Sequence, residues 1–118
     1  MINTSRILLE PKGNEWRLAK DLLIDINEPR IRLYIPEGFI TDLASVPRAI
    51  WSFVPPYGLH TRAAVIHDWL YRSKLQITRA EADKVFLEIM QQDEVDPVLA
   101  KLMYRAVRMF GSASYKAR

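Results

Sequence analysis

Apolar and polar residues alternate along the first third of the chain and recur at helical spacing along the remainder. Residues 30–35 (RIRLYI) alternate strictly, which is the period of a half-buried strand. Residues 15–26 are patterned more loosely and predict one or two further strands. The turn-forming residues 27–29 (NEP) are expected to connect these strands, and residues 36–38 (PEG) to end the second.

Three helices are predicted in the second half of the chain. The first begins near Thr61, which we expect to cap it, and runs through Tyr71. Residues 78–81 (TRAE) form a capping box, so the second helix begins there. Residues 96–97 (DP) supply a cap and a first-turn proline for the third helix, which Gly111 is expected to end.

These elements predict an α+β fold in which a small N-terminal antiparallel β-sheet precedes a three-helix region with an antiparallel helix pair. The 118 residues suit a single domain, expected to span 1–118. Its predicted parts are β-rich 1–38, a loop at 39–60 with a short helix at 48–54, helical 61–111, and a loose tail at 112–118.

Composition excludes several classes of site. The chain has no cysteine, which removes disulfides, thiolate zinc sites and a cysteine nucleophile together. A net charge of +3 is too small to indicate nucleic acid, which we do not expect as a partner. The first residues lack the apolar core of a signal peptide, so none is expected. The sequence has no run of about 18 apolar residues, so no transmembrane segment is expected either.

The segment His67-Asp68-Trp69-Leu70-Tyr71 is the most informative for chemistry. On a helix His67 and Tyr71 share a face, and Asp68 lies about 100° round from His67. The next helix follows after a short connection, which favours an antiparallel neighbour, and carries Asp83 early in its sequence. A histidine held by a carboxylate is the arrangement of a general base, and Asp68 would then be available to bind a hard cation such as calcium.

This HDxxY pattern, followed by a helix carrying DKVF, resembles secreted calcium-dependent phospholipases and, more closely, the compact phospholipase domain of parvovirus capsids. The resemblance implies that His67 activates water, that Asp68 binds calcium, and that Tyr71 and Asp83 orient the histidine. It covers about 25 residues. Those enzymes place a YxGxG loop before the helix, whereas this chain has residues 56–60 (PYGLH).

A structural interpretation of the same residues stays open. His67 would then be a satisfied core histidine, and Asp68 would make a local salt bridge or cap. Tyr71 would only pack, and Asp83 would lie near a helix N-terminus, where negative charge is favoured.

The segment 38–48 (GFITDLASVPR), followed by the HDWLY helix, resembles a small family of unknown function encoded by phages and prophages. This second resemblance covers about two-thirds of the chain and carries no established activity. It implies a phage context, with other virion proteins or bacterial membrane lipid as partners. The expected location is the virion or the host cytoplasm.

The residues of this loop suggest a part in a site. Asp42 is a candidate third carboxylate for a metal, or a group that orients His67, and Thr41 and Arg48 are candidates for binding substrate or an anion. The alternative is a local turn in which Ser45 caps the short helix after it.

Two weaker features complete the candidate sites. His60 could join His67 and a carboxylate at zinc, but the spacing fits no zinc motif, and a lone loop histidine is usually solvated. Lys101, Arg105 and Arg108 form a basic stripe on the last helix. Such a stripe is usually a solvated face, and the alternative is contact with a membrane surface or an acidic partner.

The sequence therefore supports two main hypotheses. In the first, the protein is a metal-dependent hydrolase of lipid or other esters, with calcium as the most plausible cation, acting at the start of infection or at lysis. In the second, it is a non-enzymatic virion, tail or assembly component in which the histidine and carboxylates form a buried polar network. The two differ in whether His67 reaches solvent.

Overall fold

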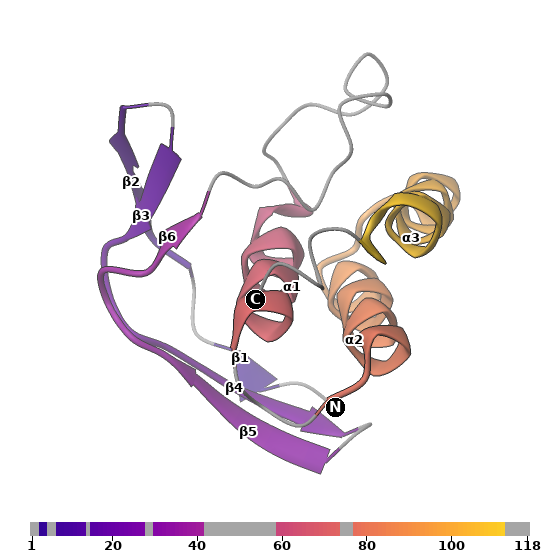
Figure 1. The fold of residues 1–118 in the computed structure, drawn as a ribbon, viewed down its shortest axis with the longest axis horizontal. Coiled ribbons are helices and arrows are strands. Elements are labelled where there is room, and N and C mark those ends of the chain that lie inside the picture. Colours follow the sequence, from indigo (N-terminus) through magenta and orange to yellow (C-terminus); the bar gives the residue numbers. More distant parts are fainter. Residues whose placement is uncertain are drawn as a thin grey trace. The chain divides into compact units, whose positions relative to one another are not determined.

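A computed structural model of the chain describes residues 3–4, 7–13, 15–27, 30–41, 59–73 and 77–112. The chain divides into two compact units, Met1–Asp42 and Leu43–Arg118. Every strand of the described residues belongs to the first unit and every helix to the second (Figure 1). The prediction of an α+β chain, with strands first and helices after them, is confirmed.

The described part of the first unit contains two three-stranded antiparallel sheets, where the sequence predicted one small sheet. One sheet has the order β1-β4-β5 and the other β2-β3-β6. The strands are β1 (Asn3–Thr4), β2 (Leu9–Lys12), β3 (Glu15–Leu18), β4 (Leu22–Asn27), β5 (Arg30–Ile35) and β6 (Ile40–Thr41). The sequence pattern missed β1, β2 and β6, which are too short to display a period.

The hairpin of β4 and β5 has the alternation that the sequence predicted. Leu22 lies opposite Ile35, and Ile24 opposite Leu33, with all four side chains buried. The residues between them in each strand are exposed or half-buried. Alternation at period two therefore places one apolar face of the pair inside the protein.

The helices begin close to where the sequence predicted. They are α1 (Thr61–Arg72), α2 (Arg79–Gln92) and α3 (Pro97–Phe110), and Gly111 caps the last of them. The prediction that Thr61 caps α1 is wrong: the N-cap is His60, which makes no side-chain capping bond, and Thr61 is the first helical residue.

The start of α2 has both halves of the predicted capping box. The Thr78 hydroxyl accepts from the Glu81 backbone N–H at 3.0 Å, and the Glu81 carboxylate accepts from the Thr78 N–H at 2.9 Å. At the start of α3 the Asp96 carboxylate accepts from the Leu99 N–H at 3.0 Å.

We expect Thr78→Ala to lower the free energy of unfolding by about 1 kcal/mol, because an orphan N–H of the first turn loses its acceptor. Urea unfolding followed by circular dichroism measures this. Lys84→Ala, at an exposed site of the same helix, is the control and should change stability by less than about 0.5 kcal/mol. Equal effects of the two substitutions would contradict the capping assignment.

The helices pack in antiparallel pairs around α2, which contacts both α1 and α3. At one end, Arg62 near the start of α1 donates two hydrogen bonds, of 2.8 and 2.7 Å, to Asp93 at the end of α2. At the other end, Arg79 at the start of α2 donates to the Val107 carbonyl near the end of α3 at 3.2 Å. The predicted antiparallel helix pair is therefore present.

Three predictions lie wholly or partly outside the described residues: the turn at 27–29, the short helix at 48–54 and the tail at 112–118. Within the described part of the chain, no helix has the length and hydropathy needed to cross a membrane.

Candidate functional site

The antiparallel pairing of α1 and α2 brings the predicted His67, Tyr71 and Asp83 together. His67 and Tyr71 lie one helical turn apart on α1, so both side chains face α2. The His67 Nε2 atom lies 2.7 Å from Asp83 Oδ1, and the Tyr71 hydroxyl donates to the same oxygen. One carboxylate oxygen thus receives both groups.

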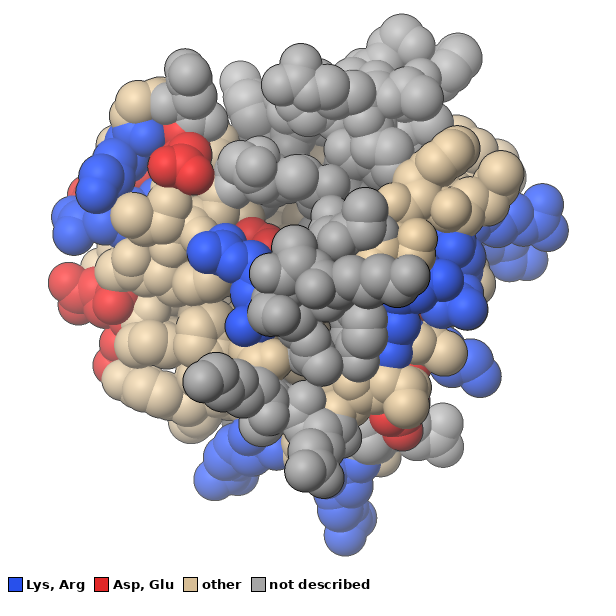
Figure 2. Space-filling model, viewed as in Figure 1, with Lys and Arg blue, Asp and Glu red and all other residues tan. Residues whose placement is uncertain are grey.

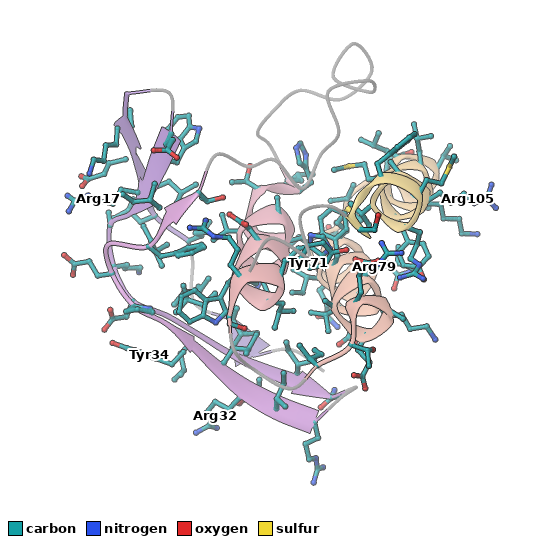
Figure 3. The ribbon with its side chains drawn as sticks, in the orientation of Figure 1. Arg17, Arg32, Tyr34, Tyr71, Arg79 and Arg105 are labelled. Carbon is teal, nitrogen blue, oxygen red and sulfur yellow. The ribbon has the colours of Figure 1, made fainter. Side chains whose placement is uncertain are left out.

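The second oxygen of Asp83 faces two arginines. Arg108 of α3 donates from Nη1 to Oδ2 at 2.7 Å, and Nη1 of Arg79 lies 3.7 Å from the same atom. Arg79 also donates to the carbonyls of Val107 and Arg108, which caps the end of α3. We call His67, Tyr71, Arg79, Asp83 and Arg108 the Asp83 network; Tyr71 and Arg79 are labelled in Figure 3.

The centre of the Asp83 network is buried. Asp83 is 0% exposed, His67 2% and Tyr71 3%, whereas the Arg108 side chain is 36% exposed. Burial raises the pKa of Asp83, but hydrogen bonds from His67, Tyr71 and Arg108 outweigh burial and hold this pKa below 3.8. Asp83 is therefore an ionised acceptor near neutral pH.

The ionised state of Asp83 fixes the protons on its neighbours. Burial raises the pKa of Tyr71, and the hydrogen bond to Asp83 raises it further, so the phenol stays neutral and donates. Because an ionised carboxylate only accepts, the bond to His67 requires a proton on Nε2. In the neutral imidazole the basic lone pair is then on Nδ1.

The depressed pKa of Asp83 predicts a loss of stability in acid. A carboxyl group with a lower pKa in the folded state contributes stability that is present above its unfolded pKa of 3.8 and is lost as pH falls through the folded pKa. We therefore expect the melting temperature of the wild type to fall more steeply below about pH 4 than that of Asp83→Asn. Parallel curves in calorimetry from pH 2 to 7 would contradict the linkage.

Packing holds the imidazole and phenol rings in place. The His67 ring centroid lies 4.1 Å from that of Tyr71 and 4.8 Å from that of Phe86. Gly111 approaches the same phenol: a Cβ there would lie 2.8 Å from the Tyr71 oxygen and 2.5 Å from the Val107 carbonyl oxygen. A side chain at this position would displace either the helix end or Tyr71, so a glycine fits the network.

The described residues alone do not make the predicted calcium site. The Asp68 carboxylate accepts from Arg72 Nη1 at 3.2 Å, the local salt bridge of the structural interpretation. Among the residues that the structure describes, no group of three acidic, histidine or cysteine side chains is arranged to hold a metal. His60, the weaker zinc candidate, is buried at the start of α1, where a solvated loop residue was expected.

The other predicted residues come from the preceding loop. Thr41 is a buried residue of β6 and lies opposite Trp16 of β3, so it belongs to the first compact unit. Asp42 and Arg48 lie outside the described residues. The roles predicted for these three residues stay predictions.

Sequence reasoning missed the two arginines of the network. Arg108 was assigned to a solvated basic stripe with Lys101 and Arg105, but its guanidinium turns inward to Asp83. Arg79 was noted only as one of the two residues between the capping residues Thr78 and Glu81. The predicted packing of the helices could have indicated these arginines. A buried carboxylate needs a cation, and antiparallel packing brings the end of α3 to the start of α2.

Comparison with known proteins confirms that the chain is related to a family of unknown function. Residues 16–107 match a family described as proteins of unknown function, DUF1353. The chain belongs to this family. The part of it that matches DUF1353 contains His67, Tyr71, Arg79 and Asp83 and ends one residue before Arg108.

One curated relative of this DUF1353 chain is the uncharacterized protein y4iH of Sinorhizobium fredii (strain NBRC 101917 / NGR234). It is 40% identical over 73 residues, which are 60% of this chain and 30% of the relative. The chain thus spans less than a third of the relative's length. No solved structure matches the chain. None of these descriptions names an activity, so function has to be argued from the Asp83 network.

Proposed function

We propose that the protein is a hydrolase of lipid or other esters in which His67 is the general base. The observation that carries the proposal is that one carboxylate oxygen, Asp83 Oδ1, accepts two hydrogen bonds. One comes from His67 Nε2 and the other from the Tyr71 hydroxyl. A carboxylate held in this way fixes the tautomer of the histidine and stabilises the imidazolium that forms when it accepts a proton.

In the proposed reaction, which requires water and substrate to reach the buried His67 ring, Nδ1 removes a proton from water as the water oxygen attacks the ester carbonyl carbon. The tetrahedral intermediate then collapses, the bond to the alcohol oxygen breaks, and the imidazolium returns the proton to the leaving alkoxide. The products are a carboxylic acid and an alcohol, and His67 ends neutral. Asp83 keeps its charge throughout, because Tyr71 and Arg108 continue to donate to it.

Calcium at Asp68 and Asp42 stays part of the proposal and needs its own test. When bound, such an ion would polarise the ester carbonyl and hold the developing oxyanion. Because Arg72 pairs with Asp68, a metal would have to compete with this salt bridge. If the ion binds, Ca²⁺ should raise the melting temperature of the wild type but not that of Asp68→Asn. Arg48 and Thr41 keep their proposed role in binding substrate or an anion.

The phage context is proposed on sequence resemblance alone. A lipid esterase would act on bacterial membrane lipid at the start of infection or at lysis. It would reside in the virion with other phage proteins, or in the host cytoplasm.

The burial of the network favours a second candidate, a non-enzymatic phage component. His67 and Tyr71 are each less than 4% exposed, and Asp83 joins all three helices. A fully satisfied polar network of this kind specifies one packing of the helices without any chemistry. In this candidate Asp83 contributes only to stability.

Ester hydrolysis by the purified protein tests the two candidates. The substrates would be nitrophenyl esters of increasing chain length and mixed phospholipid vesicles, each with and without Ca²⁺. Hydrolysis by the wild type that His67→Gln lacks would support the hydrolase. Absence of hydrolysis on every substrate, or equal rates for the two proteins, would support the structural candidate.

A further inference from the structure

The outer face of α3 carries an apolar stripe that the fold leaves exposed. Val98, Leu102 and Met109 are exposed, and their spacing of four and seven residues places them on one side of the helix. The buried side of α3 consists of Ala100, Met103, Ala106 and Val107. The helix is therefore apolar on two faces, and only one of them contributes to the core.

Cations accompany this stripe. Lys101 and Arg105 are exposed and fall on the same side of α3, three residues after Val98 and after Leu102. Neither takes part in an ion pair with a described residue, and the sequence of α3 contains no acidic residue. Arg105 points away from the other helices (Figure 3), and Lys and Arg side chains border the tan surface over α3 (Figure 2). The exposed face of α3 is therefore complementary to a surface that is apolar and carries negative charge.

A second copy of the chain does not suit this face. In a two-fold symmetric contact each copy presents the same patch, so Lys101 and Arg105 would meet the same cations of the partner. Like charges brought together at a contact oppose binding. The complementary surface must be anionic.

The dimensions of the face favour a bilayer over a protein. The stripe extends from Val98 to Met109, a rise of about 16 Å along the helix at 1.5 Å per residue. Three apolar side chains offer much less than the roughly 800 Å² per partner of a stable protein interface. A helix lying on a membrane needs less, because each apolar side chain that enters the interface and each cation at an anionic headgroup adds to binding.

We propose that α3 binds the surface of an anionic lipid bilayer, with Val98, Leu102 and Met109 entering the headgroup region and Lys101 and Arg105 facing anionic headgroups. The proposal goes beyond ester hydrolysis and does not depend on it, because it uses no residue that touches the proposed substrate. It would hold equally for a non-enzymatic protein.

Co-sedimentation of the full chain with unilamellar vesicles tests this proposal. We expect binding to vesicles of phosphatidylglycerol and phosphatidylcholine, and much weaker binding to phosphatidylcholine alone. The double variant Lys101→Gln/Arg105→Gln should bind about 25-fold more weakly, since each basic residue near an anionic surface contributes about fivefold. The control Lys12→Gln/Lys84→Gln removes two exposed lysines from other elements and should bind like the wild type.

A second variant pair separates lipid contact from simple charge attraction. Leu102→Ala/Met109→Ala should weaken binding roughly tenfold at unchanged charge, because less apolar area leaves water. The proposal would be overturned if the protein did not bind anionic vesicles at low salt. It would also be overturned if Lys101→Gln/Arg105→Gln and Lys12→Gln/Lys84→Gln weakened binding equally. A third contrary result would be a wild-type dimer, seen in light scattering, that the Leu102→Ala/Met109→Ala variant does not form.

Discussion

Replacing Asp83 by alanine should lower the free energy of unfolding by about 3–5 kcal/mol, the cost of removing one partner from a buried charged pair. The carboxylate accepts hydrogen bonds from His67, Tyr71 and Arg108. Arg108 is partly exposed and would recover hydration, so most of the loss arises at the two buried donors. A loss of this size is a large fraction of the stability of a small domain.

Urea unfolding at pH 7 measures this loss, and two variants bracket it. Glu88→Ala removes a carboxylate from a half-buried position of the same helix and should change stability by less than about 0.5 kcal/mol. Asp83→Asn keeps the volume and one acceptor oxygen, so it should remain folded and lie between the two. If Asp83→Ala is as stable as Glu88→Ala, the Asp83 network does not hold the helices together.

The second expected result is a loss of ester hydrolysis of about 10²–10⁴-fold in His67→Gln, the usual contribution of a general base. Asp83→Asn should lose a similar amount while it remains folded. A neutral amide neither stabilises the imidazolium nor dictates that Nε2 carries the proton. The loss should appear in kcat, because neither residue binds the substrate in the proposed reaction.

The matched control for this experiment is His60→Gln, which replaces the other buried histidine, outside the Asp83 network. Its rate should stay within about twofold of the wild type, since His60 has no part in the proposed proton transfer. Rates that fall only in proportion to the unfolded fraction, in all three variants, would indicate that the network is structural.

The fold could be predicted where local signals were strong. The capping box at Thr78 and the Asp96-Pro97 pair fixed the starts of α2 and α3, because side-chain oxygens bond N–H groups only a few residues away. The pairing of the described strands into separate sheets could not be predicted. It depends on contacts such as Trp16 opposite Thr41, which lie far apart in the sequence.

The candidate site divides in the same way. His67, Tyr71 and Asp83 could be predicted because helical spacing and a short connection leave few ways to place them. Arg108 could not, since it is 25 residues from Asp83 and a third helix has to pack before its long side chain reaches the carboxylate. Its position in a stripe with Lys101 and Arg105 instead favoured the prediction that the Arg108 side chain lies in solvent.

The position of the proton on His67, measured by long-range ¹H–¹⁵N NMR of the imidazole at pH 8, tests most directly whether Asp83 holds this histidine as a base. We predict that Nε2 carries the proton and donates it to Asp83, and that Nδ1 carries no proton. His60→Gln leaves one histidine signal and so assigns the spectrum to His67. A proton on Nδ1 in place of Nε2 would contradict this assignment, because Nε2 could then not donate to Asp83 and Nδ1 could not act as the base.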